Sequence, residues 1–88
     1  MNEGAGMTPE QVAHLIRSSL SQATVEVRSG DNVHFDARVV SPDFAGKRPL
    51  QRHQLVYRAL GELMGGEIHA LSIEALTPEE SAQTARSA

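Results

Sequence analysis

The stretch that decides the fold is Phe44-Ala-Gly-Lys-Arg-Pro-Leu-Gln-Arg-His-Gln-Leu-Val-Tyr57, together with Ile68-His-Ala-Leu-Ser-Ile73 and Leu76-Thr-Pro-Glu-Glu80. In the first segment, a loop that contains glycine and lysine leads into a helix whose first turns carry basic residues. Pro49 suits the first turn of that helix, because the backbone N–H that proline lacks would have no helical partner there. The second segment is a strand that opens with a histidine, and the third begins with a capping pattern. The order of these segments predicts a helix that connects two strands of one sheet.

Two amphipathic helices are predicted. The first covers residues 9–21, because Thr8 and Gln11 form a capping box pattern around Pro9 and apolar residues then recur at helical spacing. The second covers residues 50–64 and is followed by Gly65-Gly66 as its stop. Its predicted apolar face consists of Leu50, His53, Val56, Tyr57, Leu60, Leu63 and Met64.

Three strands are predicted to complete the fold. Val25 and Val27 alternate with polar residues, a turn cluster follows at residues 29–32, and residues 34–39 alternate again, which indicates a hairpin. The third strand covers residues 68–75, and a strand–helix–strand step favours a right-handed crossover with parallel strands. The predicted class is α+β, with order α-β-β-α-β and a short final helical turn: a three-stranded mixed sheet covered on one face by helices. Residues 1–7 are predicted to be a disordered leader, residues 8–80 the domain and residues 81–88 a mobile tail.

Composition excludes several classes of function. The chain has 88 residues, 3% aromatic residues and no cysteine. One small domain of this kind has no thiol nucleophile, no thiolate metal site of its own and few rings on which bases could stack. No paired-carboxylate, triad or phosphate-loop signature is present, so we expect no enzyme. Neither a signal peptide nor a membrane-spanning run is recognisable, and the expected location is the cytoplasm.

Two histidines are candidate metal ligands. His34 lies near the start of the second predicted strand and His69 near the start of the third. If these strands are parallel neighbours about 5 Å apart, both imidazoles leave the same sheet edge and could converge on one metal or cluster. Neither histidine belongs to a local ligand motif, and the alternative is a solvent-facing or hydrogen-bonded histidine.

A basic segment is the second candidate site. Residues 46–58 hold half of the eight Lys and Arg residues of the chain, although its net charge of −3 argues against general affinity for nucleic acid. A glycine-containing loop before a helix can contact phosphates through backbone amides and basic side chains. The alternative is a solvated helix face that docks an acidic partner surface. The candidate residues are Gly46, Lys47, Arg48, Arg52 and Arg58.

The three segments quoted above resemble the BolA family of small proteins over roughly residues 8–80. The resemblance implies a type II KH-like fold without an enzymatic centre. Its members look like accessory partners of monothiol glutaredoxins in iron–sulfur cluster handling, and a nucleic-acid role has been proposed for some. KH domains clamp nucleic acid with a Gly-x-x-Gly loop, and this chain has Pro49 at the position of the second glycine.

The resemblance also implies a ligand set. In proteins of this kind the histidine of the Ile-His-Ala segment binds the cluster, which corresponds to His69, and the hairpin loop before the second strand supplies a second ligand. His34 lies in that region but is offset slightly toward the strand. A [2Fe–2S] cluster would be shared with a glutaredoxin and its glutathione, and the isolated chain would hold none. Relatives commonly carry tryptophan where Ser81 stands here, which leaves the packing of the C-terminal helix open.

The main functional prediction is therefore an accessory protein that binds a monothiol glutaredoxin, with or without a shared cluster. The first alternative is a DNA-binding regulator that uses the basic segment. The second alternative is a homodimeric interaction module without a metal.

Overall fold

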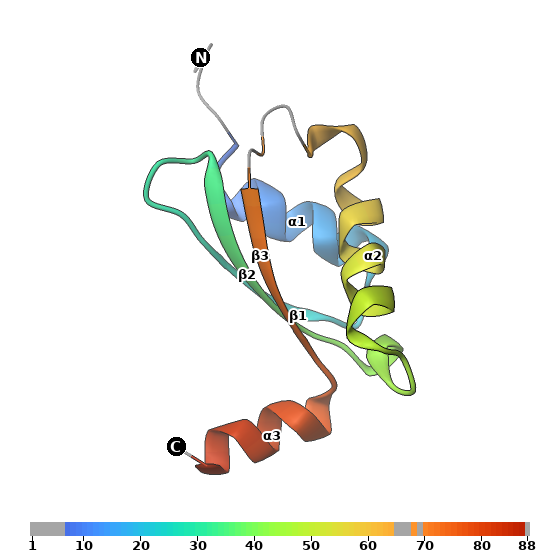
Figure 1. The fold of residues 1–88 in the computed structure, drawn as a ribbon. Coiled ribbons are helices and arrows are strands. Elements are labelled where there is room, and N and C mark those ends of the chain that lie inside the picture. Colours follow the sequence, from blue (N-terminus) through green and yellow to red (C-terminus); the bar gives the residue numbers. More distant parts are fainter. Residues whose placement is uncertain (1–6, 65–67, 69, 88) are drawn as a thin grey trace.

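The computed structural model describes residues 7–64, 68 and 70–87. Its elements follow the predicted order, with two additional short 3-10 helices, and the predicted α+β class is confirmed (Figure 1). They are α1 (Pro9–Ser19), β1 (Thr24–Arg28), β2 (His34–Val40), η1 (Pro42–Phe44), α2 (Pro49–Leu60), η2 (Gly61–Leu63), β3 (Ala70–Leu76) and α3 (Pro78–Ser87).

The sheet has the strand order β1-β2-β3 and is mixed, as predicted. β1 pairs with β2 in antiparallel fashion, with Val25 opposite Val39. β2 pairs with β3 in parallel, with His34 opposite Ala70 and Val40 opposite Leu76. The connection through α2 therefore makes the parallel crossover that the strand–helix–strand order predicts.

One face of the sheet carries the core. Phe35, Ala37 and Val39 of β2 are buried, whereas His34 and Asp36, which alternate with them, are exposed. α1 and α2 both lie on the buried face, and α3 begins near the start of α2 and extends away from them (Figure 1). The fully buried side chains of the helices and loops that complete this core are Val12, Ile16, Phe44, Val56 and Ile68.

Local capping explains where the helices begin. The Thr8 hydroxyl accepts a hydrogen bond from the Gln11 N–H, and the Gln11 side chain accepts one from the Thr8 N–H, so the predicted capping box is confirmed. Thr77 and Glu80 make the same reciprocal pair at the start of α3. None of the helices in the described part of the chain is long and apolar enough to cross a membrane.

The face that α2 buries is narrower than predicted. Val56 and Leu60 are buried, but Leu50 is 69% exposed and Tyr57 is 39% exposed, so their prediction as core residues is wrong. At ~100° per residue, both lie roughly a quarter turn from the stripe formed by Val56 and Leu60, outside the sector that faces the sheet. The two residues leave apolar surface on the solvent side of α2.

Several element ends differ from the predicted ones. α1 ends at Ser19, two residues before the predicted end, and β3 begins at Ala70. α2 ends at Leu60 and is capped by Gly61, whose positive φ of 58° favours glycine, whereas the predicted stop at residues 65–66 lies outside the described residues. α3 runs to Ser87, where only a short turn was predicted. The disorder of residues 1–7 and the mobility of residues 81–88 stay predictions, and residues 1–6 and 88 also lie outside the described residues.

Candidate functional site

The β1–β2 hairpin turn is built around the carboxylate of Asp31. Its Oδ1 atom accepts hydrogen bonds from the backbone N–H groups of Val33 at 3.0 Å and His34 at 2.9 Å. The Ser29 hydroxyl closes the turn, since it donates to the His34 carbonyl at 2.6 Å and accepts from the Asn32 N–H at 2.8 Å. Asn32 has a positive φ of 60°, a conformation that asparagine tolerates better than most residues. The turn therefore fixes the start of β2.

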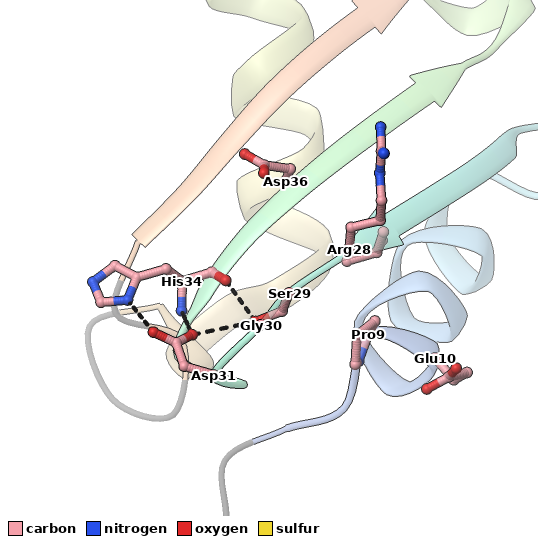
Figure 2. Close-up of a pocket in the computed structure, with 9 residues that line it drawn as sticks. Pro9, Glu10, Arg28, Ser29, Gly30, Asp31, His34 and Asp36 are labelled. Carbon is pink, nitrogen blue, oxygen red and sulfur yellow. Dashed lines mark hydrogen bonds and ion pairs between the residues drawn. The ribbon is translucent and has the colours of Figure 1, made fainter.

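The same carboxylate binds the imidazole of His34. Asp31 Oδ2 lies 2.8 Å from His34 Nδ1, as Figure 2 shows. An ionised carboxylate only accepts hydrogen bonds, so in a neutral imidazole this contact places the hydrogen on Nδ1 and the lone pair on Nε2. Hydrogen bonds from the backbone and the side chain of His34, and then from the backbone of Val33, hold the pKa of Asp31 well below its usual range. Both side chains are more than half exposed.

An open groove lies beside this pair. Its lining combines the hairpin with the start of α1 and the polar side of β2 (Figure 2). Three carboxylates and one guanidinium line it, so the groove carries net negative charge when His34 is neutral. Its charged and titratable lining residues are Glu10, Arg28, Asp31, His34 and Asp36.

The parallel arrangement on which the two-histidine prediction depends is confirmed. His34 pairs with Ala70, the residue that follows His69 in the sequence. His69 itself lies outside the described residues, so its convergence with His34 stays a prediction. Within residues 7–64, 68 and 70–87, no group of three or more His, Cys, Asp and Glu side chains could hold a metal ion.

The basic segment divides into an exposed part and an internal part. Lys47 and Arg48 are exposed in the loop before α2, and Arg58 is exposed in the last turn of that helix. Gly46 has a positive φ of 76°, which turns the chain between Phe44 and the helix and favours glycine there. These residues form the solvent-facing part of the segment.

Arg52 differs from the other basic residues, because its side chain is only 12% exposed. Its Nη1 atom donates to Glu80 Oε1 at 2.7 Å and to the Ala75 carbonyl at 3.1 Å, and its Nε atom donates to the Lys47 carbonyl at 2.9 Å. Its guanidinium carbon lies 5.9 Å from the centre of the Phe44 ring. Arg52 therefore joins α2 to the end of β3 and to α3, and the structure does not bring it into the exposed basic surface.

Glu80 is the residue that sequence reasoning missed as the partner of Arg52. In the sequence it is the last residue of a capping pattern, whereas its pairing with Arg52 spans 28 positions, for which the sequence carries no local signal. The hydrogen bond from Arg52 and then the backbone hydrogen bond at Thr77 lower the pKa of Glu80 from 4.5 to about 2. The carboxylate is therefore ionised throughout the neutral range.

Comparison with known proteins decides the family. The family described as BolA-like protein matches residues 6–80 of the chain. The chain belongs to the BolA family. Among solved BolA structures, a homologue from Coxiella burnetii is 42% identical, with a TM-score of 0.77, over 86% of this chain and 97% of that one.

Curated BolA relatives are similarly close in sequence. BolA-like protein 1 from Homo sapiens is 42% identical over 74 residues, which cover 74% of this chain and 54% of the human protein. The DNA-binding transcriptional regulator BolA from Haemophilus influenzae is 45% identical over 51 residues, which cover 58% of this chain and 50% of that protein. The chain thus spans about half the length of these two curated relatives.

Proposed function

We propose that this BolA-family chain is an accessory protein that binds a monothiol glutaredoxin and shares a [2Fe–2S] cluster with it, in iron–sulfur cluster trafficking or iron-linked regulation. The proposed activity is binding, not catalysis. His69 is the principal ligand of this chain and His34 the auxiliary one. Glutathione and the glutaredoxin supply the remaining ligands.

The observation that carries the proposal is the parallel pairing of β2 with β3. It sets His34 opposite Ala70, directly after His69 in the sequence, at the edge where both strands begin. His34 is exposed there, and its contact with Asp31 leaves Nε2 with the lone pair that a metal requires. These features, with the family resemblance of the Ile-His-Ala segment, support a ligand pair at this edge.

The donor set of the chain fits a shared cluster better than a resident one. The chain has no cysteine, so it can offer imidazoles to a cluster but no thiolate. Two imidazoles on one iron are known in [2Fe–2S] centres, where thiolates hold the other iron. When bound, the cluster supplies an iron–sulfur unit that can pass to a recipient protein. The thiolates must come from the partner and its glutathione.

The experiment that tests the proposal mixes the purified chain with a cluster-loaded monothiol glutaredoxin and glutathione. Visible absorption and circular dichroism should change on mixing, because ligand exchange at one iron alters the charge-transfer bands. We expect His69→Ala to abolish or alter the new spectrum and His34→Ala to alter it less. His14→Ala is the matched control, since His14 is exposed on α1, and it should leave the spectrum unchanged. If the His69→Ala complex had the same spectrum and stability as the parent complex, the assignment of His69 as a cluster ligand would be wrong.

A second candidate function is DNA binding. It is favoured by the exposed side chains of Lys47, Arg48 and Arg58 and by the name of the Haemophilus influenzae relative. Replacing the three residues with alanine should weaken binding to DNA of any sequence and flatten its salt dependence, because each lost phosphate contact removes about 0.9 from the salt slope. An unchanged affinity and slope would exclude this surface as the DNA-binding site.

A further inference from the structure

We infer that Asp31 is a positioning residue, which fixes the tautomer and the ring orientation of His34 so that Nε2 is the nitrogen presented to a metal. This inference rests on the proposed function and adds to it a group that does not itself bind the cluster. It is carried by the contacts of a single carboxylate in the β1–β2 hairpin turn (Figure 2).

The carboxylate binds the backbone and the ring of the same histidine. Oδ1 accepts the N–H of His34 at 2.9 Å, and Oδ2 lies 2.8 Å from Nδ1 of the same residue. The additional bond from the Val33 N–H at 3.0 Å fixes the carboxylate to the turn. A ring that is held through Nδ1, on a residue whose backbone is held by the same carboxylate, has one preferred orientation.

A ligand histidine in a metalloprotein commonly donates its second ring N–H to a carboxylate or carbonyl in this manner. Such a partner selects the tautomer, orients the ring and raises the basicity of the ligand nitrogen. An exposed histidine without the partner would exchange between the two tautomers and rotate about its side-chain bonds. Asp31 therefore offsets the disadvantage of placing an auxiliary ligand on an exposed strand end.

Two other roles for Asp31 are separable from this one. If Asp31 bound the metal directly, Oδ2 would have to contact the metal in addition to Nδ1 of His34. If it only shaped the turn, the bonds at Oδ1 would suffice and the bond at Oδ2 would be irrelevant. Oδ1 therefore serves the shape of the turn, and Oδ2 serves the orientation of the His34 ring.

The substitution Asp31→Asn separates those roles. Asparagine keeps a carbonyl oxygen that can accept from the backbone N–H groups, so the turn is retained. Its amide nitrogen is a donor and, in place of Oδ2, it would donate to Nδ1 and move the imidazole hydrogen to Nε2. The variant should therefore keep the fold and invert the tautomer. Asp36→Asn is the matched control, because Asp36 is an exposed carboxylate in β2, two residues after His34.

The first measurement uses the isolated chain. Long-range ¹H–¹⁵N correlation spectra at a pH of about 8, where imidazole side chains are neutral, identify which ring nitrogen of His34 carries the hydrogen. We expect Nδ1–H in the parent chain and in Asp36→Asn, and Nε2–H in Asp31→Asn, with the backbone amide shifts of β2 retained. A parent His34 with Nε2–H, or a tautomer that does not respond to Asp31→Asn, would overturn the inference whatever the glutaredoxin complex does.

The second measurement uses the complex with cluster-loaded glutaredoxin. Loss of a hydrogen-bonded partner of a ligand typically weakens metal binding 10–100-fold, so Asp31→Asn should release the cluster to a chelator about tenfold faster or more. Parent-like release by Asp31→Asn, in a complex that His34→Ala does perturb, would refute the positioning role and leave the proposed function standing. If only His69→Ala changes the spectrum, His34 is not a ligand and the inference about Asp31 is wrong. The proposed binding of a glutaredoxin with a cluster held by His69 would still stand. If neither histidine variant changes the spectrum, the ligand pair and the inference fall together.

Discussion

Replacing Arg52 with alanine tests whether this residue belongs to the structure or to a phosphate-binding surface. The side chain is almost fully covered and donates to the carbonyls of Ala75 and Lys47. A hydrogen bond with a charged donor contributes about 1.5–3 kcal/mol, and the bond to the part-buried Ala75 carbonyl should account for most of the loss. The exposed Lys47 carbonyl and the ring of Phe44 add less. We expect a loss of about 2–3 kcal/mol in the free energy of unfolding, without counting the ion pair to Glu80.

Thermal and urea unfolding, followed by circular dichroism, measure this loss. In a domain of this size, 1 kcal/mol corresponds to about 4–8 °C in Tm, so Arg52→Ala should unfold roughly 10–20 °C below the parent chain. Lys47→Ala is the control, because Lys47 has an exposed side chain in the adjoining loop, and its Tm should change little. Arg52→Lys should recover only part of the loss, since an ammonium group lacks the planar fork that reaches the carboxylate and both carbonyls. A Tm for Arg52→Ala within about 2 °C of that for Lys47→Ala would refute the structural role.

Two further predictions concern the packing of α3 and α2. The hydrogen-bonded ion pair with Arg52 lowers the pKa of Glu80. The pair therefore stabilises the fold fully at a pH above the ordinary pKa of 4.5, and this stabilisation is lost as the pH falls toward the folded-state pKa of about 2. The Tm difference between the parent and Glu80→Gln should therefore shrink between pH 6 and pH 2, and a constant difference would contradict the assignment. In α2, Val56→Ala should lower the free energy of unfolding by about 2 kcal/mol, because Val56 is fully buried. Tyr57→Ala should lower it by less than about 1 kcal/mol, because Tyr57 is 39% exposed. If the two variants lost equal free energy of unfolding in urea, the assignment of Val56, and not Tyr57, to the buried face of α2 would be wrong.

Features that depend on neighbouring residues could be predicted from the sequence. The capping pairs at Thr8 and Thr77 join residues three positions apart, so the sequence pattern predicts both. The alternation in β2 depends on a period of two and predicted the buried face of the sheet correctly. The parallel pairing of β2 and β3 followed from element order alone, because a crossover helix leaves few other topologies.

Features that depend on distant residues could not be predicted. The contact of Arg52 with Glu80 exists because α2 begins close to the point where β3 ends, which no local pattern encodes. Leu50 and Tyr57 fit a helical period, but the width of the buried stripe is set by the sheet against which α2 packs. The pair of Asp31 and His34 is different, since an aspartate three residues before a histidine in a turn was a usable signal for a side-chain contact.

The two candidate sites lie at opposite ends of β2, and this separation has a consequence for how the chain could use them. His34 begins the strand, and Val40 ends it shortly before the loop of Gly46, Lys47 and Arg48 (Figure 1). The strand has seven residues, and the six steps of about 3.3 Å between its first and last residue place its two ends about 20 Å apart. A glutaredoxin at the hairpin edge and a polyanion at the basic loop would therefore contact different surfaces.

Substitutions at His34 should leave the salt dependence of any DNA binding unchanged, and those at Lys47 and Arg48 should leave the cluster spectrum unchanged. If each set instead altered both properties, the two activities would have to share one surface, and the division of the molecule into a histidine edge and a basic loop would be wrong.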